Sequence, residues 1–173
     1  LHLSIRRQRQ MCIRDRHRLL EHPNTDADLF SSLTLLAHAG APCPVPLKER
    51  LLELAPHDAV WEFYGSTEGQ FTVCPPDLWR TAPGTVGLAR PGRRLEVREV
   101  RDDGVGTVWC HAPEHARWTY WRAPGRTDEA WDGDAFTVGD LGSFDENGRL
   151  FLHGRPGDLV ITGGVNVYPA EVE

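Results

Sequence analysis

The sequence predicts an α/β fold, a partial parallel sheet with a helix, that continues into a small and mostly antiparallel β subdomain. Residues 33–63 show the order strand, helix, strand that is typical of a βαβ unit, and from residue 84 short strand-like runs alternate with turns. A Gly- and Pro-containing break after residue 153 predicts the start of a small α+β C-terminal domain. The predicted divisions are 1–18, 19–83, 84–156 and 157–173.

The parallel sheet and its helix are predicted from three segments. The apolar run LTLLA at 33–37 predicts a buried strand, and AVWEF at 59–63 predicts a second one. Between them, Pro46 can occupy the first turn of a helix over 47–55, whose leucines form one buried face. On this helix Lys48 is predicted to face water.

The antiparallel part is marked by two strong hairpin signals, Asp103-Gly104 and Asn147-Gly148. The second is expected to join a strand at 143–144 to one at 150–152. Pro169 opens an expected helix near the end of the chain. The other expected strands are TVGLA at 85–89, LEVREV at 95–100, GTVWC at 106–110 and AFTV at 135–138. A short apolar run, LVIT at 159–162, and a Gly-Gly loop at 163–164 follow the last break.

Composition narrows the possible functions. The 173 residues carry a formal net charge of −6. No apolar run approaches the roughly 18 residues that a membrane-spanning helix needs, so no transmembrane segment is expected. Six arginines within residues 1–18 argue against a signal peptide, which makes the cytoplasm the default location. The acidic remainder argues against nucleic-acid binding. Residues 1–18 are interpreted as a disordered or extraneous leader, the alternative being a nucleic-acid arm.

Four cysteines, at 12, 43, 74 and 110, show no CxxC pair and are interpreted as free thiols in a reducing compartment. One metal cluster, Cys110 with His111 and His115, is conceivable. Pro113 makes a regular helix there improbable, so ligand spacing does not support it.

The segment YGSTEG at 64–69 directly follows a predicted parallel strand, at the end where α/β sheets bind ligands. Tyr64 offers a ring for stacking, Gly65 allows close backbone approach, Thr67 offers a hydroxyl to oxyanions, and Glu68 can hold Mg²⁺. These types suit a nucleotide phosphate. The alternative is an ordinary polar turn.

Two further side chains support a nucleotide site. Asp140, expected at the end of a strand, can accept hydrogen bonds from ribose hydroxyls, and Arg155 can bind ribose or phosphate. The alternatives are an acidic residue of a hairpin turn and a surface arginine on a linker.

Four motifs occur in one order: HAGAP at 38–42, EFYGSTEG at 62–69, FTVGDLG at 136–142 and GRPGDLVITGGVNVYPAEVE at 154–173. Together they resemble the adenylate-forming (AMP-binding) superfamily, and most closely its acyl-CoA synthetases, the fatty-acid–CoA ligases. The resemblance covers about residues 19–173.

The resemblance implies a ligase that activates a carboxylic acid, with a fatty acid as the expected class, uses ATP and Mg²⁺, and passes the acyl group from the adenylate to coenzyme A. It implies catalytic roles for Thr67 at the α-phosphate and for Glu68 as the metal ligand. The implied binding residues are Gly40, Ala41, Pro42, Tyr64 and Gly65 around adenine, Asp140 and Arg155 at the ribose, and Gly163 and Gly164 at the thiol channel.

The sequence also departs from the family's pattern. Gly157 stands where the hinge usually carries Asp or Lys, and neither the phosphate loop nor the C-terminal catalytic Lys occurs in the chain. The chain therefore resembles an internal fragment of a longer ligase and is expected to be inactive alone. The alternatives are an adenylation domain that loads a carrier protein, and a non-enzymatic β-rich binding module.

Overall fold

The computed structural model describes residues 8–10, 18, 20–22, 25–40, 43–156, 160–162 and 165–167. These residues fall into two compact units, which we call the first unit (within 1–65 and 72–87) and the second unit (within 66–71 and 88–173). The predicted divisions after residues 83 and 156 stay predictions.

The first unit contains a sheet that includes parallel strands. β1 (Gln8–Gln10), β2 (Leu35–His38), β3 (Val60–Ser66) and β4 (Gly69–Cys74) are neighbours in this order. β1 pairs with β2 and β2 pairs with β3, both in parallel. The predicted mixed α/β class with a parallel sheet is thereby confirmed.

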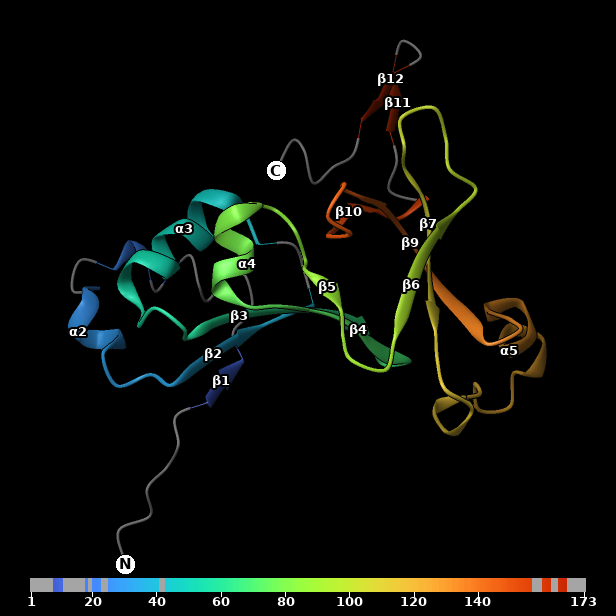
Figure 1. Cartoon of the computed structure of the whole chain (residues 1–173), viewed down its shortest axis with the longest axis horizontal. Helices are drawn as coiled ribbons and strands as arrows, with labels where there is room; N and C mark the ends of the chain where they lie inside the picture. The colour runs from blue at the N-terminus through green and yellow to red at the C-terminus, as the bar shows by residue number, and fades with distance from the viewer. Residues whose placement is uncertain are drawn as a thin grey trace, which may run out of the picture. The chain divides into compact units, whose positions relative to one another are not determined.

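The connection between β2 and β3 is α3 (Val45–Leu54), the predicted helix, which begins two residues earlier than expected. α3 and α4 (Pro76–Thr81) lie on the same side of the strands β2 and β3 (Figure 1). The core of this unit unites α3 with β2, β3 and the short helix α2 (Ala27–Phe30). Its buried residues are Phe30, Leu36, Leu51, Leu54, Ala55, Ala59 and Val60.

β1 differs from the expectation for residues 1–18, which placed this stretch outside the fold. Gln8–Gln10 pairs with Leu35–Ala37 of β2. A polar sequence such as Gln-Arg-Gln shows no apolar alternation, but strand pairing uses backbone groups that every residue except proline carries. The sequence pattern therefore gave no signal for this strand.

The second unit is built on an antiparallel sheet in the order β10-β9-β7-β6, with β8 also paired to β9. Both predicted hairpins are confirmed, between β6 and β7 and between β9 and β10. The strands are β6 (Arg94–Arg98), β7 (Gly106–His111), β8 (Trp131–Asp132), β9 (Ala135–Phe144) and β10 (Leu150–Gly154).

Two strand lengths differ from the expectation. The expected strand at 85–89 is reduced to β5 (Leu88–Ala89), which follows β4 in its sheet. β9, expected over 135–138, continues to Phe144. The apolar run at 159–162 contributes β11 (Val160–Thr162), paired with β12 (Val165–Val167). The expected helix at Pro169 lies outside the described residues.

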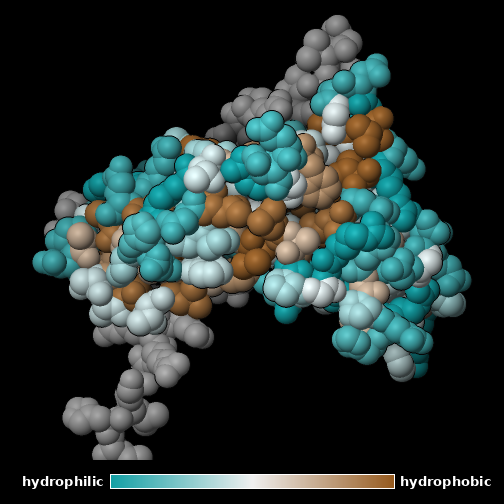
Figure 2. All heavy atoms as spheres, in the orientation of Figure 1, coloured by the Kyte–Doolittle hydropathy of each residue, from teal (hydrophilic) through white to brown (hydrophobic). Residues whose placement is uncertain are grey.

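The core of the second unit is aromatic. Trp118, Trp131 and Phe136 have ring centroids 4.9–5.3 Å apart, and Phe71 lies 5.4 Å from Phe136. The chain reaches this cluster through the 3₁₀ turn η1 (Glu114–Ala116) and α5 (Pro124–Ala130). The outward surface of α5 is hydrophilic (Figure 2).

The helices of the described residues are short. The longest, α3, has 10 residues. Among the described residues, none of the helices combines the length and the apolar character needed to cross a bilayer.

Gly87 lies where the backbone approaches β4 most closely. It has a φ of +98°, and a Cβ there would lie 2.2 Å from the carbonyl oxygen of Val73. Gly84, in the same unit, has a φ of +90° but only Val45 Cγ2 nearby, at 3.9 Å. Substitutions at these two glycines therefore separate the cost of the left-handed backbone conformation from the cost of the close contact with Val73.

We expect Gly84→Ala to lower the free energy of unfolding by about 1–2 kcal/mol, the cost of a left-handed L-residue. Gly87→Ala should cost more, because the backbone must also move away from Val73. Urea unfolding followed by circular dichroism measures both. Equal losses in the two variants would show that the contact with Val73 contributes nothing.

Candidate functional site

The segment YGSTEG forms a strand end and a tight turn. β3 continues through Tyr64 and Gly65 to Ser66, and only Thr67 and Glu68 separate it from β4. This corrects the expectation that the whole segment follows the strand. The reason is the burial pattern, since Val60, Glu62 and Tyr64 are all buried and their alternation extends the strand into the motif.

Glu68 is held by hydrogen bonds on both its side chain and its backbone. The Tyr120 hydroxyl donates to Glu68 Oε1 at 2.6 Å, and the Glu68 backbone N–H donates to Ser66 Oγ at 3.3 Å. Burial raises the pKa of Glu68, but the hydrogen bonds from Tyr120 and Ser66 and the charge of Arg155 outweigh it and lower the pKa overall. The carboxylate is therefore ionised at neutral pH and suited to a cation.

Asp140 lies on a bulge in the middle of β9, which corrects its expected place at the end of a strand. Pairing runs from Thr137 opposite Trp109 to Leu141 opposite Thr107, so Val138–Asp140 stands against a single residue of β7. Gly139 supplies the φ of +81° that this bulge requires. A bulge turns a side chain out of the regular alternation, and here the side chain is Asp140.

The bulge brings Asp140 to Arg155. Arg155 Nε donates to Asp140 Oδ1 at 2.8 Å, with the aspartate side chain 17% exposed and the arginine 61% exposed. Arg155 also acts electrostatically on Glu68. Two predicted site residues, Asp140 and Arg155, therefore form an ion pair in the second unit, and the charge of this arginine also reaches Glu68. Such carboxylates and a guanidinium can bind hydroxyl groups, a cation or an oxyanion.

The other predicted residues have separate places. Thr67 is exposed beside Glu68, and Gly40 is exposed after β2 with a φ of +87°. Tyr64 is buried and Gly65 is half-buried, both in the first unit. Ala41, Pro42, Gly163 and Gly164 lie outside the described residues. The roles implied for all of these stay predictions.

A buried charge cluster stands directly before the Tyr64 segment, and the sequence analysis missed it. Lys48 Nζ donates to Glu62 Oε2 at 2.5 Å, and His38 Nε2 lies 3.8 Å from the same oxygen. Lys48 is fully buried, which corrects its predicted exposure. The available signal was Glu62 itself, an acid at an inward position between Val60 and Tyr64, which needs a buried partner.

The conceivable metal cluster of Cys110, His111 and His115 is not supported. Cys110 is buried, and burial raises the pKa of its thiol to about 11, so it remains protonated. His111, the next residue of β7, points to the opposite face of the sheet, where it contacts Asp134 at 2.9 Å and Glu96 at 3.2 Å. Cys43, Cys74 and Cys110 are free thiols, as expected.

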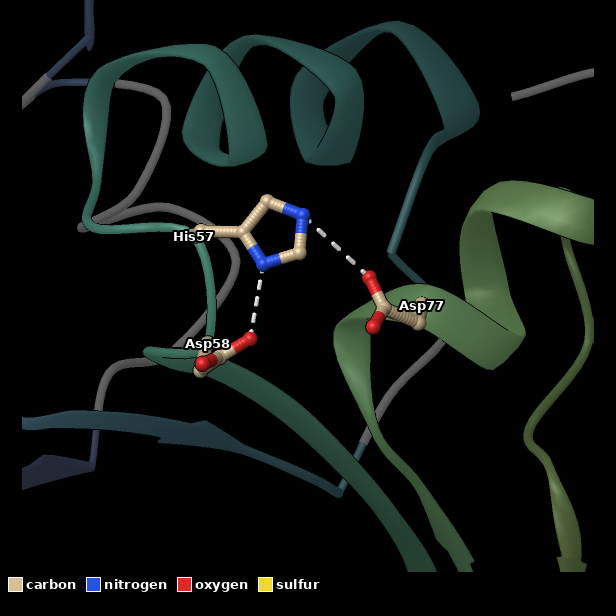
Figure 3. A group of neighbouring side chains, drawn as sticks. All are labelled: His57, Asp58 and Asp77. Atoms are coloured by element: carbon tan, nitrogen blue, oxygen red, sulfur yellow. Dashed lines mark hydrogen bonds and ion pairs between the residues drawn. The ribbon is translucent and has the colours of Figure 1, made fainter.

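Three exposed side chains, those of His57, Asp58 and Asp77, have atoms close together that could bind a metal ion. His57 Nδ1 lies 2.7 Å from Asp58 Oδ1, and His57 Nε2 lies 3.4 Å from Asp77 Oδ1 (Figure 3). However, the Arg80 guanidinium contacts both His57 Nε2, at 3.3 Å, and Asp77 Oδ1, at 2.8 Å. The positive charge of Arg80 thus already lies beside these two ligand atoms, which disfavours the binding of a metal ion there.

Residues 11–121 match the family of AMP-binding enzymes. The chain belongs to this family. The resemblance to adenylate-forming enzymes of the acyl-CoA synthetase type is thereby confirmed. The match begins at residue 11, inside the stretch 1–18 that the sequence analysis set apart.

Several relatives of this AMP-binding chain act on acyl groups. A 3-[(3aS,4S,7aS)-7a-methyl-1,5-dioxo-octahydro-1H-inden-4-yl]propanoyl:CoA ligase of Rhodococcus jostii is 35% identical over 90% of the chain and 30% of its own length. A fatty acid–[acyl-carrier-protein] ligase, ScoC of Streptomyces coeruleorubidus, is 34% identical over 90% of the chain and 31% of its length.

Among solved structures, O-succinylbenzoate coenzyme A synthetase of Bacillus subtilis in complex with ATP and magnesium ion matches with a TM-score of 0.79 and 27% identity. The match covers 96% of the chain and 35% of that structure. The chain thus spans about a third of the length of the proteins it matches.

The buried Lys48–Glu62 pair yields a stability prediction. Lys48→Met leaves Glu62 as an uncompensated buried charge and should lower the free energy of unfolding by about 3–5 kcal/mol. Lys48→Met combined with Glu62→Gln removes both charges and should recover most of this loss. Denaturant unfolding measures both variants, and a double variant no more stable than Lys48→Met would contradict the role of charge.

Proposed function

We propose that the chain is the part of an ATP-dependent acid–thiol ligase that binds AMP during the activation of a carboxylic acid. In this reaction the carboxylate attacks the α-phosphate of ATP, pyrophosphate leaves, and the acyl group then passes from the adenylate to the thiol of coenzyme A. The observation that carries the proposal is the ion pair of Asp140 and Arg155 in the second unit, whose arginine also acts electrostatically on Glu68.

Asp140 and Arg155 would bind the ribose. A carboxylate has two oxygens with several acceptor sites, so Asp140 can bind a guanidinium and hydroxyl groups together, and the guanidinium of Arg155 carries five donors. Their ion pair fixes the direction of Asp140 before the nucleotide arrives. Such preorganisation reduces the entropy lost on binding.

Glu68 fits a divalent cation, because it is an ionised and oxygen-bearing ligand of the kind Mg²⁺ prefers. Mg²⁺ bound there would neutralise charge on the phosphates. The known relative with bound ATP and magnesium supports this assignment. Thr67, the neighbouring turn residue, would contact the α-phosphate.

The remaining assignments come from the resemblance. Gly40, Ala41 and Pro42 would line one side of adenine, with Tyr64 and Gly65 on the other, and Gly163 and Gly164 would face the thiol. A fatty acid is the proposed substrate class, and the carrier-protein ligase among the relatives acts on fatty acids by name.

The same relative supports a second candidate, in which the thiol belongs to a carrier protein instead of coenzyme A. The first candidate is preferred because the sequence from Gly163 to Glu173 resembles free-standing synthetases. The two differ in the acceptor alone.

The first test of the proposal is nucleotide binding. Asp140→Asn should weaken AMP binding by about tenfold or more, because a hydrogen bond to a charged group contributes about 1.5–3 kcal/mol. Isothermal titration calorimetry measures this affinity. Asp128→Asn, which changes an exposed acid on α5, is the control and should bind as the unchanged chain does. Failure of the unchanged chain to bind AMP would refute the proposal.

The second test concerns the acceptor. With a non-hydrolysable acyl-adenylate analogue bound, we expect the chain to bind coenzyme A in calorimetry and to show no binding to a carrier domain carrying phosphopantetheine. The carrier domain without its phosphopantetheine is the control for non-specific association. Binding of the loaded carrier domain but not of coenzyme A would favour the second candidate.

A further inference from the structure

We infer that Tyr120 is a positioning residue for Glu68, whose hydroxyl holds this carboxylate in the direction needed for a divalent cation bound with the nucleotide. The inference rests on the proposed function, since it assigns Glu68 to the cation. It adds a residue 52 positions away in the sequence, joined to Glu68 by a hydrogen bond of 2.6 Å.

The contact is built to stay in place, because Tyr120 is anchored at both its backbone and its ring. The Tyr120 backbone N–H donates to Thr127 Oγ1 at 2.9 Å, and that buried hydroxyl donates to the Ala123 carbonyl at 3.2 Å. The first turn of α5 thus fixes the backbone of Tyr120.

The ring of Tyr120 is fixed by the aromatic core of the second unit. It meets the Trp118 ring edge-on at 4.8 Å, and Trp118 in turn packs edge-on against Phe136 at 5.3 Å. On another side, the Arg126 guanidinium lies 5.1 Å from the ring centroid. The hydroxyl therefore points to Glu68 from a rigid base rather than from a free loop.

The chemistry of the pair suits this role. The hydrogen bond to Glu68, burial and the negative charge of Glu68 raise the pKa of Tyr120, so its hydroxyl remains a donor at neutral pH. The same bond stabilises the ionised form of Glu68. It engages Oε1, one of the two carboxylate oxygens, and a carboxylate can bind a donor and a cation at the same time.

Arg155 shows why a neutral donor matters here. Its positive charge already favours ionised Glu68, and it is paired with Asp140. A second cationic partner on Glu68 would compete with a metal ion for the same charge. A tyrosine hydroxyl fixes the carboxylate without adding positive charge.

The test compares Tyr120→Phe with a matched control. The phenylalanine keeps the ring against Trp118 and removes only the hydroxyl. Thr107→Val removes another hydroxyl that bonds a carboxylate in the same unit, that of Glu99 at 3.2 Å. The first measurement is urea unfolding followed by circular dichroism, which shows whether both variants fold as the unchanged chain does. We expect both to remain folded, and Thr107→Val to bind ATP with Mg²⁺ as the unchanged chain does.

The second measurement is calorimetric binding of ATP with and without Mg²⁺. Tyr120→Phe should weaken binding in the presence of Mg²⁺ by about tenfold, equivalent to one charge-assisted hydrogen bond, and leave Mg²⁺-free binding unchanged. In the background of Glu68→Gln, adding Tyr120→Phe should have no further effect on the Mg²⁺-dependent part.

The outcomes separate the inference from the proposed function. Normal Mg²⁺-dependent binding in Tyr120→Phe overturns the inference and leaves the proposed function standing. Equal loss with and without Mg²⁺ shows a merely structural tyrosine and also overturns it. If the unchanged chain binds no ATP at all, both fail together.

Discussion

The two-residue turn between β3 and β4 is the constraint on which the candidate site depends. β3 is held in parallel register by β2, with Leu36 opposite Val60, and β4 begins only two residues after β3 ends. A shift of one residue would turn every inward side chain of β3 outward, including the buried Val60, and so the register is strongly fixed. The strand therefore ends at a fixed residue, which leaves Glu68 in the turn that follows it.

The irregularity in β9 lies between two buried residues that face opposite sides of the sheet. Phe136 pairs with Cys110 and Leu141 pairs with Thr107, and these two partners lie on opposite faces of β7. Between them, Val138–Asp140 stands against a single residue of β7, so β9 carries two extra residues there. Two extra residues leave the alternation on either side unchanged. They also take Asp140 out of the regular pairing, where it meets Arg155.

Local signals made much of the fold predictable. Asn147-Gly148 and Asp103-Gly104 encode their turns within a few residues, and the apolar runs around α3 encode the βαβ order. Two of the failures concern contacts between distant segments. β1 was missed because its pairing uses the backbone, and the burial of Lys48 was missed because its partner Glu62 lies on another element.

The candidate site, like the fold, was predictable where the signal is local and not where it depends on distant contacts. Glu68, Asp140 and Arg155 could be named from their motifs, because residue type and order are visible in a sequence. Their joint geometry could not, since the bulge that directs Asp140 follows from how β9 pairs with β7. The sequence around Tyr120 offers only a weak signal, a tyrosine between two tryptophans. Its hydrogen bond to Glu68 joins residues 52 positions apart.

Two groups of acids in this chain show why proximity of carboxylates alone does not make a cation site. His57, Asp58 and Asp77 have side chains 68–85% exposed, where solvent screens charge, and Arg80 engages the atoms that would bind a metal. At Glu68 the arginine is instead paired with a second acid, Asp140, and the direct partner is a neutral hydroxyl. The direct partner of an acid therefore decides whether its carboxylate can also accept a cation. A guanidinium on the ligand atoms disfavours a cation, and a neutral hydroxyl does not.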